Sequence, residues 1–151
     1  MDRRATLAGM LGGAVVAGFG ATGCDLLSPE PPPPHPLAST LRRSRALVAE
    51  YQAAISAHPG LARQLTPLRD NHRAHVTQLA KLIGPTASSS PSTSPGGSAP
   101  PDEAATLTGL RDAESDAEAD AVRTCLRVKA EYAGLLGSIA ACRATHREAL
   151  A

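Results

Sequence analysis

A tract rich in serine, proline and glycine divides this chain and constrains how it can fold. The tract occupies residues 84–101 and reads GPTASSSPSTSPGGSAPP. Its composition offers too little apolar surface to build a core, so we expect residues 84–102 to form a low-complexity, disordered connection. Any folded domain must therefore be assembled from the two segments that flank the tract, residues 37–83 and 103–151.

The segment before the tract has the apolar spacing of two helices. Apolar positions that recur every three or four residues lie on one face of a helix. This face carries Leu37, Leu41, Ser44, Val48, Tyr51 and Ile55 in the first helix, and Leu61, Leu65, Leu68, His72, His75, Val76 and Leu79 in the second. The sequence His58-Pro59-Gly60 separates the helices, and Pro67 predicts a kink or a delayed start of the second helix. Residues 37–83 are therefore expected to form a helical hairpin.

The segment after the tract repeats this arrangement. The third helix is expected to carry Leu107, Leu110, Glu114, Ala117, Glu118, Ala121, Cys125 and Val128 on one face, and the fourth Tyr132, Leu135, Leu136, Ile139, Cys142, Arg143, His146 and Leu150. A constant offset along the chain aligns the apolar positions and one histidine of the second helix with those of the fourth. Residues 103–151 are therefore expected to form a second copy of the hairpin, with its turn near residue 130.

Composition and tract length favour one four-helix bundle. Hydrophobic residues make up 42% of the chain, but aromatic residues only 2%, and Trp is absent. A core of Leu, Ala, Val and Ile suits closely packed helices better than a β-sandwich. The tract could extend to roughly 55–60 Å, whereas a helix of about 22 residues is about 33 Å long. Helices two and three could therefore run parallel, joined by a long crossover, in an all-α bundle of residues 37–151.

The N-terminal residues have the form of an export signal. Arg3 and Arg4 precede an apolar stretch that runs to Phe19, and small residues lead from there to Cys24. The stretch is shorter than the approximately 20 apolar residues that a membrane-spanning helix needs. We expect residues 1–23 to be a signal peptide, read either by the general export route or by the twin-arginine route.

The last four residues of this segment, Ala-Thr-Gly-Cys, resemble a bacterial lipobox. The resemblance implies that Cys24 receives diacylglycerol and becomes the N-terminus of the mature protein. A plain secretion signal with a chance cysteine is the alternative. If Cys24 is lipidated, residues 24–36 would be a tether, in which prolines 31–34 favour a stiff, extended spacer. We expect the protein to lie on the outer face of the cytoplasmic membrane, held there by its lipid.

Two hairpins, a long crossover and inward histidines on helices two and four resemble the ferritin-like four-helix bundle. The stretches LVAEYQAAISAHPGLARQLTPLRDNHRAH and LLGSIAACRATHREAL are similar to ferritin-like lipoproteins of high-GC Gram-positive, actinobacterial type. The resemblance covers residues 37–151 and implies a fold and an envelope location without a settled activity. Di-metal ferritin-like proteins carry an inward Glu on helices one and three, and Glu-x-x-His on helices two and four.

The corresponding positions of this chain depart from that metal-binding pattern. Glu50 on the first helix falls about 140° from the centre of the apolar face, so its side chain should point to solvent. Histidine replaces the glutamate of Glu-x-x-His on the second helix, and arginine replaces it on the fourth. We expect one polar layer in the core, formed by His72, His75, Glu114, Glu118, Arg143 and His146.

Three interpretations of this layer are open. In the first, Arg143 takes the place and the charge of a lost metal and pairs with Glu114 and Glu118, beside neutral histidines. In the second, the layer holds one divalent ion, such as zinc, iron or copper. Its ligands would be His75, His146 and either Glu118 or Glu114, with or without His72. In the third, the groups are partly hydrated and have no specific role. A di-iron enzyme is not expected, because two of the four glutamates are missing and a third points outward.

Two further cysteines, Cys125 and Cys142, lie in the expected bundle. In an exported protein such a pair commonly forms a disulfide. If the turn between the third and fourth helices lies near residue 130, the two are out of register by roughly 10 Å, which is too far to bridge. If the third helix instead continues through Ala133, they face each other. A disulfide and two reduced core cysteines both remain open.

The charge balance of the chain and the motifs that it lacks exclude several classes of function. Fifteen basic and fourteen acidic residues leave no dominant field, which argues against a nucleic-acid partner. The sequence contains no phosphate-binding loop and no CxxC motif. We expect a non-enzymatic binding or structural module with a degenerate metal site and no cofactor, whose partners are the membrane, through the lipid, and an envelope protein. The alternative is a ferritin-like protein that binds a divalent metal for sequestration or sensing.

Overall fold

A computed structural model of the chain describes residues 33–86 and 102–151. These residues form four α-helices, α1 (Ala38–Ala57), α2 (Ala62–Ile83), α3 (Glu103–Cys125) and α4 (Ala130–Ala149), and contain no strand. Short 3-10 helices, Pro59–Leu61 and Gly84–Thr86, precede and follow α2. The prediction of an all-α fold with four helices is therefore confirmed. The predictions for residues 1–23, for Cys24, for most of the tether and for most of the crossover lie outside the described residues.

The helices begin and end where local sequence favours it. Asp102 caps α3, accepting a hydrogen bond from the Ala105 backbone N–H at 2.7 Å, and Glu103 adds a negative charge to the first turn. Gly84 ends α2 with a φ of 77°, which favours glycine. The expected delayed start of α2 at Pro67 is wrong, because the 3-10 turn leads directly into the helix. Pro67 lies on an exposed face, where water can hydrate the carbonyl that loses its helical hydrogen bond.

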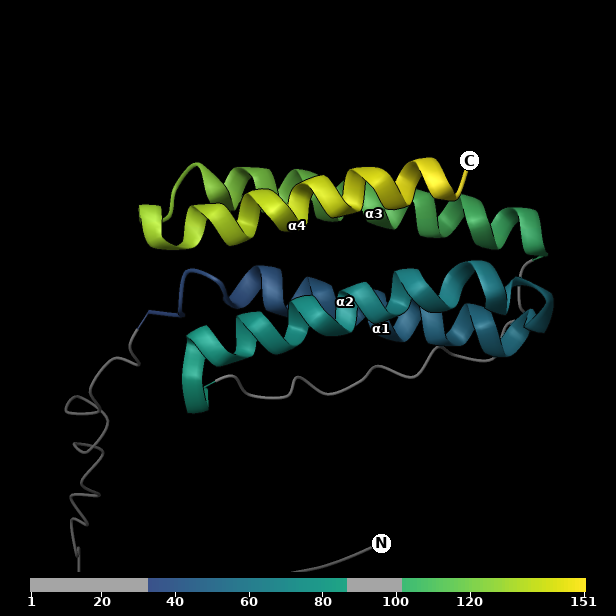
Figure 1. The fold of residues 1–151 in the computed structure, drawn as a ribbon, viewed down its shortest axis with the longest axis horizontal. Helices are drawn as coiled ribbons and strands as arrows, with labels where there is room; N and C mark the ends of the chain where they lie inside the picture. Colours follow the sequence, from purple (N-terminus) through teal and green to yellow (C-terminus); the bar gives the residue numbers. More distant parts are fainter. Residues whose placement is uncertain (1–32, 87–101) are drawn as a thin grey trace, which may run out of the picture. The chain divides into compact units, whose positions relative to one another are not determined.

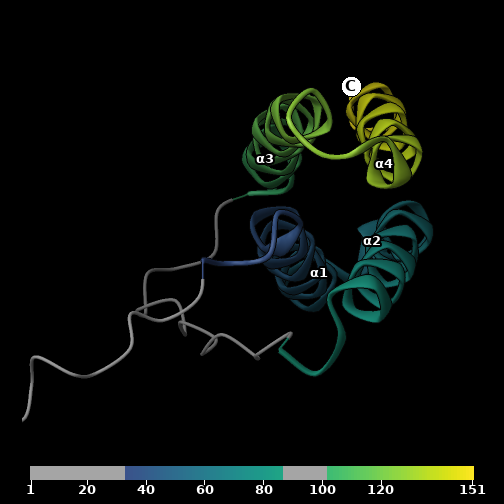
Figure 2. The ribbon, with the colours of Figure 1, turned by 90° about the vertical axis from the view of Figure 1, so that its left-hand side faces the viewer.

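The bundle consists of two hairpins, α1 with α2 and α3 with α4 (Figures 1 and 2). His58, at the end of α1, contacts Thr106, near the start of α3, at 3.1 Å. Gln64, near the start of α2, donates to the carbonyl of Ala149, at the end of α4, at 2.8 Å. Neighbouring helices of different hairpins are therefore antiparallel. It follows that α2 and α3 run in the same direction, and Figure 2 shows them at diagonal corners of the bundle.

The core contains two apolar clusters with a polar layer between them. Near the end of α1 the buried residues are Leu47, Tyr51, Ala54, Leu65, Leu68, Leu110, Ala117 and Leu150. Near the start of α1 they are Leu37, Leu41, Leu79, Ala121, Leu136, Ile139 and Ala140. Between the two sets along the helices lie the buried polar residues Ser44 of α1, His72 and His75 of α2, and Arg143 and His146 of α4, and Glu114 of α3 lies among the residues of the first set. The predicted apolar faces are largely confirmed, although Leu47 rather than Val48 is fully buried on α1.

None of the helices in residues 33–86 and 102–151 combines the length and the apolar character that crossing a membrane requires.

Candidate functional site

A single carboxylate oxygen at the centre of the bundle accepts hydrogen bonds from three helices. Glu114 of α3 is 0% exposed. Its Oε1 accepts from the Tyr51 hydroxyl of α1 at 2.7 Å, from His72 Nε2 of α2 at 2.6 Å and from His146 Nδ1 of α4 at 2.9 Å. We call these four residues the Glu114 network. One buried carboxylate thus ties all four helices together.

The network carries a carboxylate and an imidazolium. Burial alone raises the pKa of Glu114, but the hydrogen bonds from His146 and His72 outweigh it and lower the pKa to about 2. Burial alone lowers the pKa of His146, but the hydrogen bonds with Cys142 and Glu114 outweigh it and raise the pKa to about 9. At neutral pH the carboxylate and its protonated histidine therefore neutralise each other inside the core.

The other two members of the network are uncharged at neutral pH. Burial lowers the pKa of His72, so its ring is neutral and donates its single proton through Nε2 to Glu114. Burial, assisted by the nearby Glu114 charge, raises the pKa of Tyr51, which keeps its hydroxyl proton and donates it. All three donors therefore converge on an oxygen that can only accept.

The polar layer also contains buried polar atoms without a hydrogen-bond partner. These atoms are Glu114 Oε2, His72 Nδ1, His75 Nδ1 and Arg143 Nε. The His75 ring lies 5.7 Å from the His72 ring, centroid to centroid, and contributes no hydrogen bond to the network. Burial and the neighbouring His72 lower the pKa of His75 to about 4, so it is neutral at physiological pH. A buried water molecule could satisfy some of these atoms.

Arg143 is fully buried, but it does not make the predicted ion pair with Glu114 and Glu118. Its Nη1 donates to the main-chain carbonyl of Ala117 at 2.6 Å and its Nη2 to the Ser44 hydroxyl at 2.9 Å. The long side chain crosses from α4 to α3 and α1 and so passes Glu114, whose Oε1 is occupied by other donors. The prediction of buried Arg143 is correct and the prediction of its partners is wrong.

Glu118 is the predicted member that lies outside the buried layer. Its Oε2 accepts from Arg147 Nη1 of α4 at 2.7 Å, and both side chains are partly exposed, at 25% and 34%. Glu118 is one turn beyond Glu114 but rotated from the centre of the face, which is enough to bring it to the rim of the bundle. Glu50 is exposed, as predicted.

Three residues place potential metal ligands close together. His72, Glu114 and His146 each offer one ligand atom, and these atoms lie within 4.8 Å of one another. Of the predicted ligands His75, His146 and Glu118, only His146 belongs to this group. The other two members are Glu114, which was the alternative to Glu118, and His72, which was an optional additional ligand. His75 is not in the group because it presents no ligand atom to Glu114, and Glu118 is not because it faces Arg147.

Cys125 and Cys142 are free thiols, so the disulfide alternative is wrong for this structure. The turn between α3 and α4 spans residues 126–129, close to its predicted place. Cys125 therefore lies beside the turn, where its Sγ donates to the Ala133 carbonyl at 3.4 Å. Cys142 lies far from this turn, because at a rise of about 1.5 Å per residue it is roughly 18 Å along α4 from Ala130, where the helix begins.

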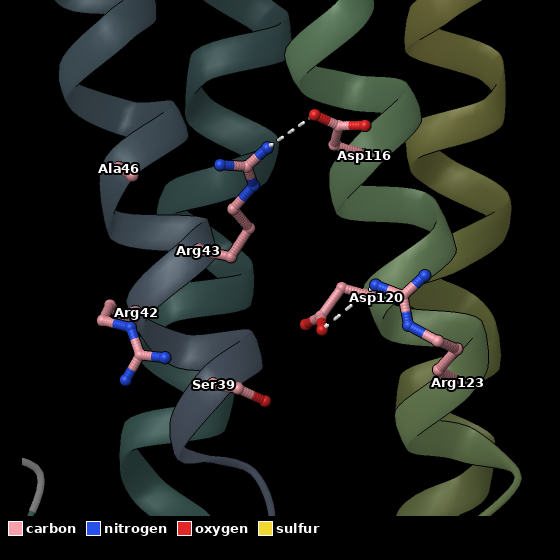
Figure 3. A pocket seen from close by; sticks show the side chains of 7 residues that line it. All are labelled: Ser39, Arg42, Arg43, Ala46, Asp116, Asp120 and Arg123. Carbon is pink, nitrogen blue, oxygen red and sulfur yellow. Dashed lines mark ion pairs between the residues drawn. The ribbon is translucent and has the colours of Figure 1, made fainter.

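A solvated groove of about 460 Å³ lies between α1 and α3, away from the Glu114 network. Its lining residues are Ser39, Arg42, Arg43, Ala46, Asp116, Asp120 and Arg123 (Figure 3). In Figure 3, Arg43 and Asp116 point toward each other across the groove, and their closest charged atoms are 3.7 Å apart. Because the Asp116 side chain is 82% exposed, this ion pair contributes little to stability.

Two contributors to the site were not named as site residues from the sequence. Tyr51 was assigned to the apolar face of the first helix, and its hydroxyl was the signal that the residue could reach a polar layer. Asn71, whose amide nitrogen lies 3.1 Å from His146 Nε2, gave no such signal because it lies outside the apolar face of the second helix.

The pKa values of His146, His75 and Glu114 in the buried polar layer predict a stability maximum near pH 6.5. His146 has a raised pKa, so its contribution is complete below pH 6.5 and is lost as pH rises toward about 9. His75 has a lowered pKa, so stability falls as pH drops from 6.5 toward about 4, and Glu114 loses its contribution from there toward about 2. We expect losses on the order of 2 kcal/mol on each side of the maximum. Urea unfolding followed by circular dichroism at a series of pH values measures the profile, and a profile that is flat between pH 6.5 and 9 would contradict the assignment of His146.

No protein-family model matches the chain, and no curated protein or solved structure is significantly similar to it.

Proposed function

We propose that this chain is a lipid-anchored cell-envelope protein whose helical bundle acts as a non-enzymatic binding or structural module. The observation that carries the role of the bundle is the saturation of Glu114 Oε1 by three protein donors, from Tyr51, His72 and His146. A buried carboxylate oxygen that already accepts hydrogen bonds from three protein donors acts as a structural element of the core. The lipid anchor rests on the lipobox-like residues that end at Cys24.

The bundle is proposed to be ferritin-like. The parallel directions of α2 and α3 support this, because the end of α2 and the start of α3 lie at opposite ends of the bundle (Figure 1). A connection between such ends has to traverse the length of the helices, which is the arrangement of ferritin-like folds with one long crossover. The polar layer at mid-height of the bundle is the second support.

The polar layer is proposed to be a degenerate metal site. Three donors already share one oxygen of Glu114, and the positive charges that balance it come from His146 and the buried Arg143. A guanidinium inside the core opposes the entry of a dication. The hydrogen-bond lengths of 2.6 and 2.9 Å to the two histidines are also shorter than the separation of about 3.3 Å between ligand atoms around a tetrahedral zinc ion.

Divalent-metal binding is the rival function, and the spacing of His72, Glu114 and His146 favours it. The two functions differ in what happens to the proton on each histidine. In the proposed module both imidazole nitrogens that face Glu114 carry protons, whereas a metal ion would have to displace those protons. The metal content of the purified protein therefore separates the two.

The anchor is tested by the location of a single variant. Wild-type protein is expected in the membrane fraction of its host and should move to detergent during phase separation, because a diacylglycerol on Cys24 partitions into lipid. Cys24→Ser should remain as the uncleaved precursor without lipid, detected by intact mass. Cys125→Ser is the matched control and should behave as the wild type does. Intact, lipid-free Cys24 in the mature wild-type protein would overturn the anchor.

A further inference from the structure

The large apolar side chains that the described part of the bundle leaves exposed all lie at one of its ends. They are Leu82, Val122 and Leu126, which are 45%, 43% and 82% exposed. Leu82 lies in the last turn of α2, Val122 lies in the last turn of α3, and Leu126 directly follows α3. Because α2 and α3 run in the same direction, these side chains share the end of the bundle at which α3 turns into α4 (Figure 1). We call it the leucine end.

The chain enters the bundle at this same end. His35 precedes α1, and its ring lies 5.7 Å, centroid to centroid, from the ring of Tyr132 in the first turn of α4. Cys24 precedes Pro34 by ten residues. Ten residues of fully extended chain span at most about 36 Å, so a lipid on Cys24 would keep the leucine end within that distance of the bilayer.

The leucine end is also the basic end of the bundle. The terminal turns of the helices there, with the 126–129 turn, contain four basic residues and one acidic residue, namely Lys81, Arg123, Arg127, Lys129 and Glu131. The terminal turns at the opposite end, with the cap of α3, contain two basic and three acidic residues, namely Arg63, Arg147, Asp102, Glu103 and Glu148. Both lysines of the chain are exposed and lie at the leucine end. Asp120, one turn further from this end, pairs with Arg123 at 3.7 Å and leaves the balance positive.

We propose that the leucine end is a second membrane contact, which docks the bundle end-on onto a bilayer surface that contains anionic phospholipids. The inference rests on the proposed lipid anchor, which brings that surface within reach. Leu126, with Val122 one turn before it on the same side of α3, enters the boundary between headgroups and acyl chains. Arg127 and Lys129 reach the lipid phosphates around it. The tether raises the local concentration of the surface, so a contact that is weak by itself is occupied.

The placement of the apolar side chains fits a bilayer better than a folded partner. Helices α2 and α3 occupy diagonal corners of the bundle (Figure 2), so Leu82 and Leu126 lie at opposite corners of the leucine end. A fluid surface can contact both corners at once. A protein partner would instead require one continuous buried centre with a polar rim.

The test uses tryptophan as a reporter, because the chain contains none. Mature Leu126→Trp protein, purified in detergent, is reconstituted into vesicles of phosphatidylglycerol and phosphatidylcholine with brominated or ordinary acyl chains. Bromine quenches only a tryptophan that reaches the acyl chains, so we expect the brominated vesicles to lower the emission of Leu126→Trp at least about twofold. Ala104→Trp, exposed in the first turn of α3 about 33 Å along the helix from Leu126, is the matched control and should not be quenched.

The charge of the surface is tested in the same assay. Vesicles of phosphatidylcholine alone, or salt at about 1 M, which shortens the screening length to about 3 Å, should remove most of the quenching. Equal quenching with and without phosphatidylglycerol, no quenching of Leu126→Trp, or equal quenching of Ala104→Trp would each overturn the proposal. Shielding of Leu126→Trp from aqueous acrylamide without quenching by bromine would also overturn it, because a second copy of the chain would then cover the leucine end.

The anchor and the docking surface fail separately in this experiment. Intact mass of the reconstituted sample reports whether Cys24 carries lipid. Lipidated protein without quenching would refute the leucine end as a membrane contact and leave the anchor in place. Quenching of a chain without lipid would refute the anchor alone.

Discussion

Replacing Glu114 with glutamine is expected to lower the free energy of unfolding by about 3–5 kcal/mol, the cost of breaking a buried charge pair by removing one partner. The change leaves the His146 imidazolium without its counter-ion in a site where Glu114 is 0% exposed. In the wild-type protein three donors converge on a charged carboxylate oxygen, and in the variant only a neutral amide oxygen can accept from them. Urea unfolding near pH 6.5, followed by circular dichroism, measures the difference.

Glu118→Gln is the matched control for this prediction. Glu118 lies one turn further along α3 and has its own cationic partner, Arg147, but both side chains are partly exposed. Exposed ion pairs typically contribute about 0–1 kcal/mol, so the control should lose no more than that. Similar losses in the two variants would mean that the buried network is not what stabilises the bundle.

Replacing Arg143 with alanine is expected to cost about 3–5 kcal/mol, whereas replacing it with methionine should cost less than about 1.5 kcal/mol. Alanine leaves a cavity where a fully buried side chain crosses the core. Methionine fills much of that space, and burial disfavours the charge that it removes. Neither hydrogen-bond partner is orphaned, because the Ala117 carbonyl lies within α3 and the Ser44 hydroxyl also donates to the Thr40 carbonyl at 2.9 Å.

Thermal unfolding of the two Arg143 variants distinguishes the effect of lost side-chain volume from the effect of the lost charge. A change of 1 kcal/mol moves the melting temperature of a domain of this size by about 4–8 °C, so the two variants should be clearly resolved. A methionine variant that is as unstable as the alanine variant would show that the guanidinium charge itself holds α1, α3 and α4 together. The volume of the Arg143 side chain would then not account for its role in the core.

The faces of the helices could be predicted from the sequence because they depend on local spacing. The offset that aligns Leu65, Leu68, His75 and Leu79 with Leu136, Ile139, His146 and Leu150 pairs residues that are all buried. A period of 3.6 residues fixes which side chains point inward, whatever the partner helix is. Five of the six predicted polar residues, all except Glu118, are accordingly in the core.

The partners of these residues could not be predicted, because they depend on how neighbouring helices are rotated and shifted along their axes. His72 and Arg143 occupy equivalent positions of the two hairpins, yet His72 reaches Glu114 and Arg143 reaches Ala117 and Ser44. A long, flexible arginine selects among acceptors several ångströms apart, and helical angle carries no information at that scale. The same holds for Tyr51, whose inward position was expected and whose bond to Glu114 was not.

We propose that hydrogen bonds among protein groups occupy the place where a ferritin-like protein would hold a metal. Elemental analysis of the full-length chain, purified in detergent from cells grown in metal-replete medium, tests it most directly, beside His146→Ala prepared in the same way. We expect far less than one equivalent of zinc, iron or copper in both samples. About one equivalent in the wild type that is lost in His146→Ala, with both proteins folded by circular dichroism, would overturn this proposal and make the protein a metalloprotein.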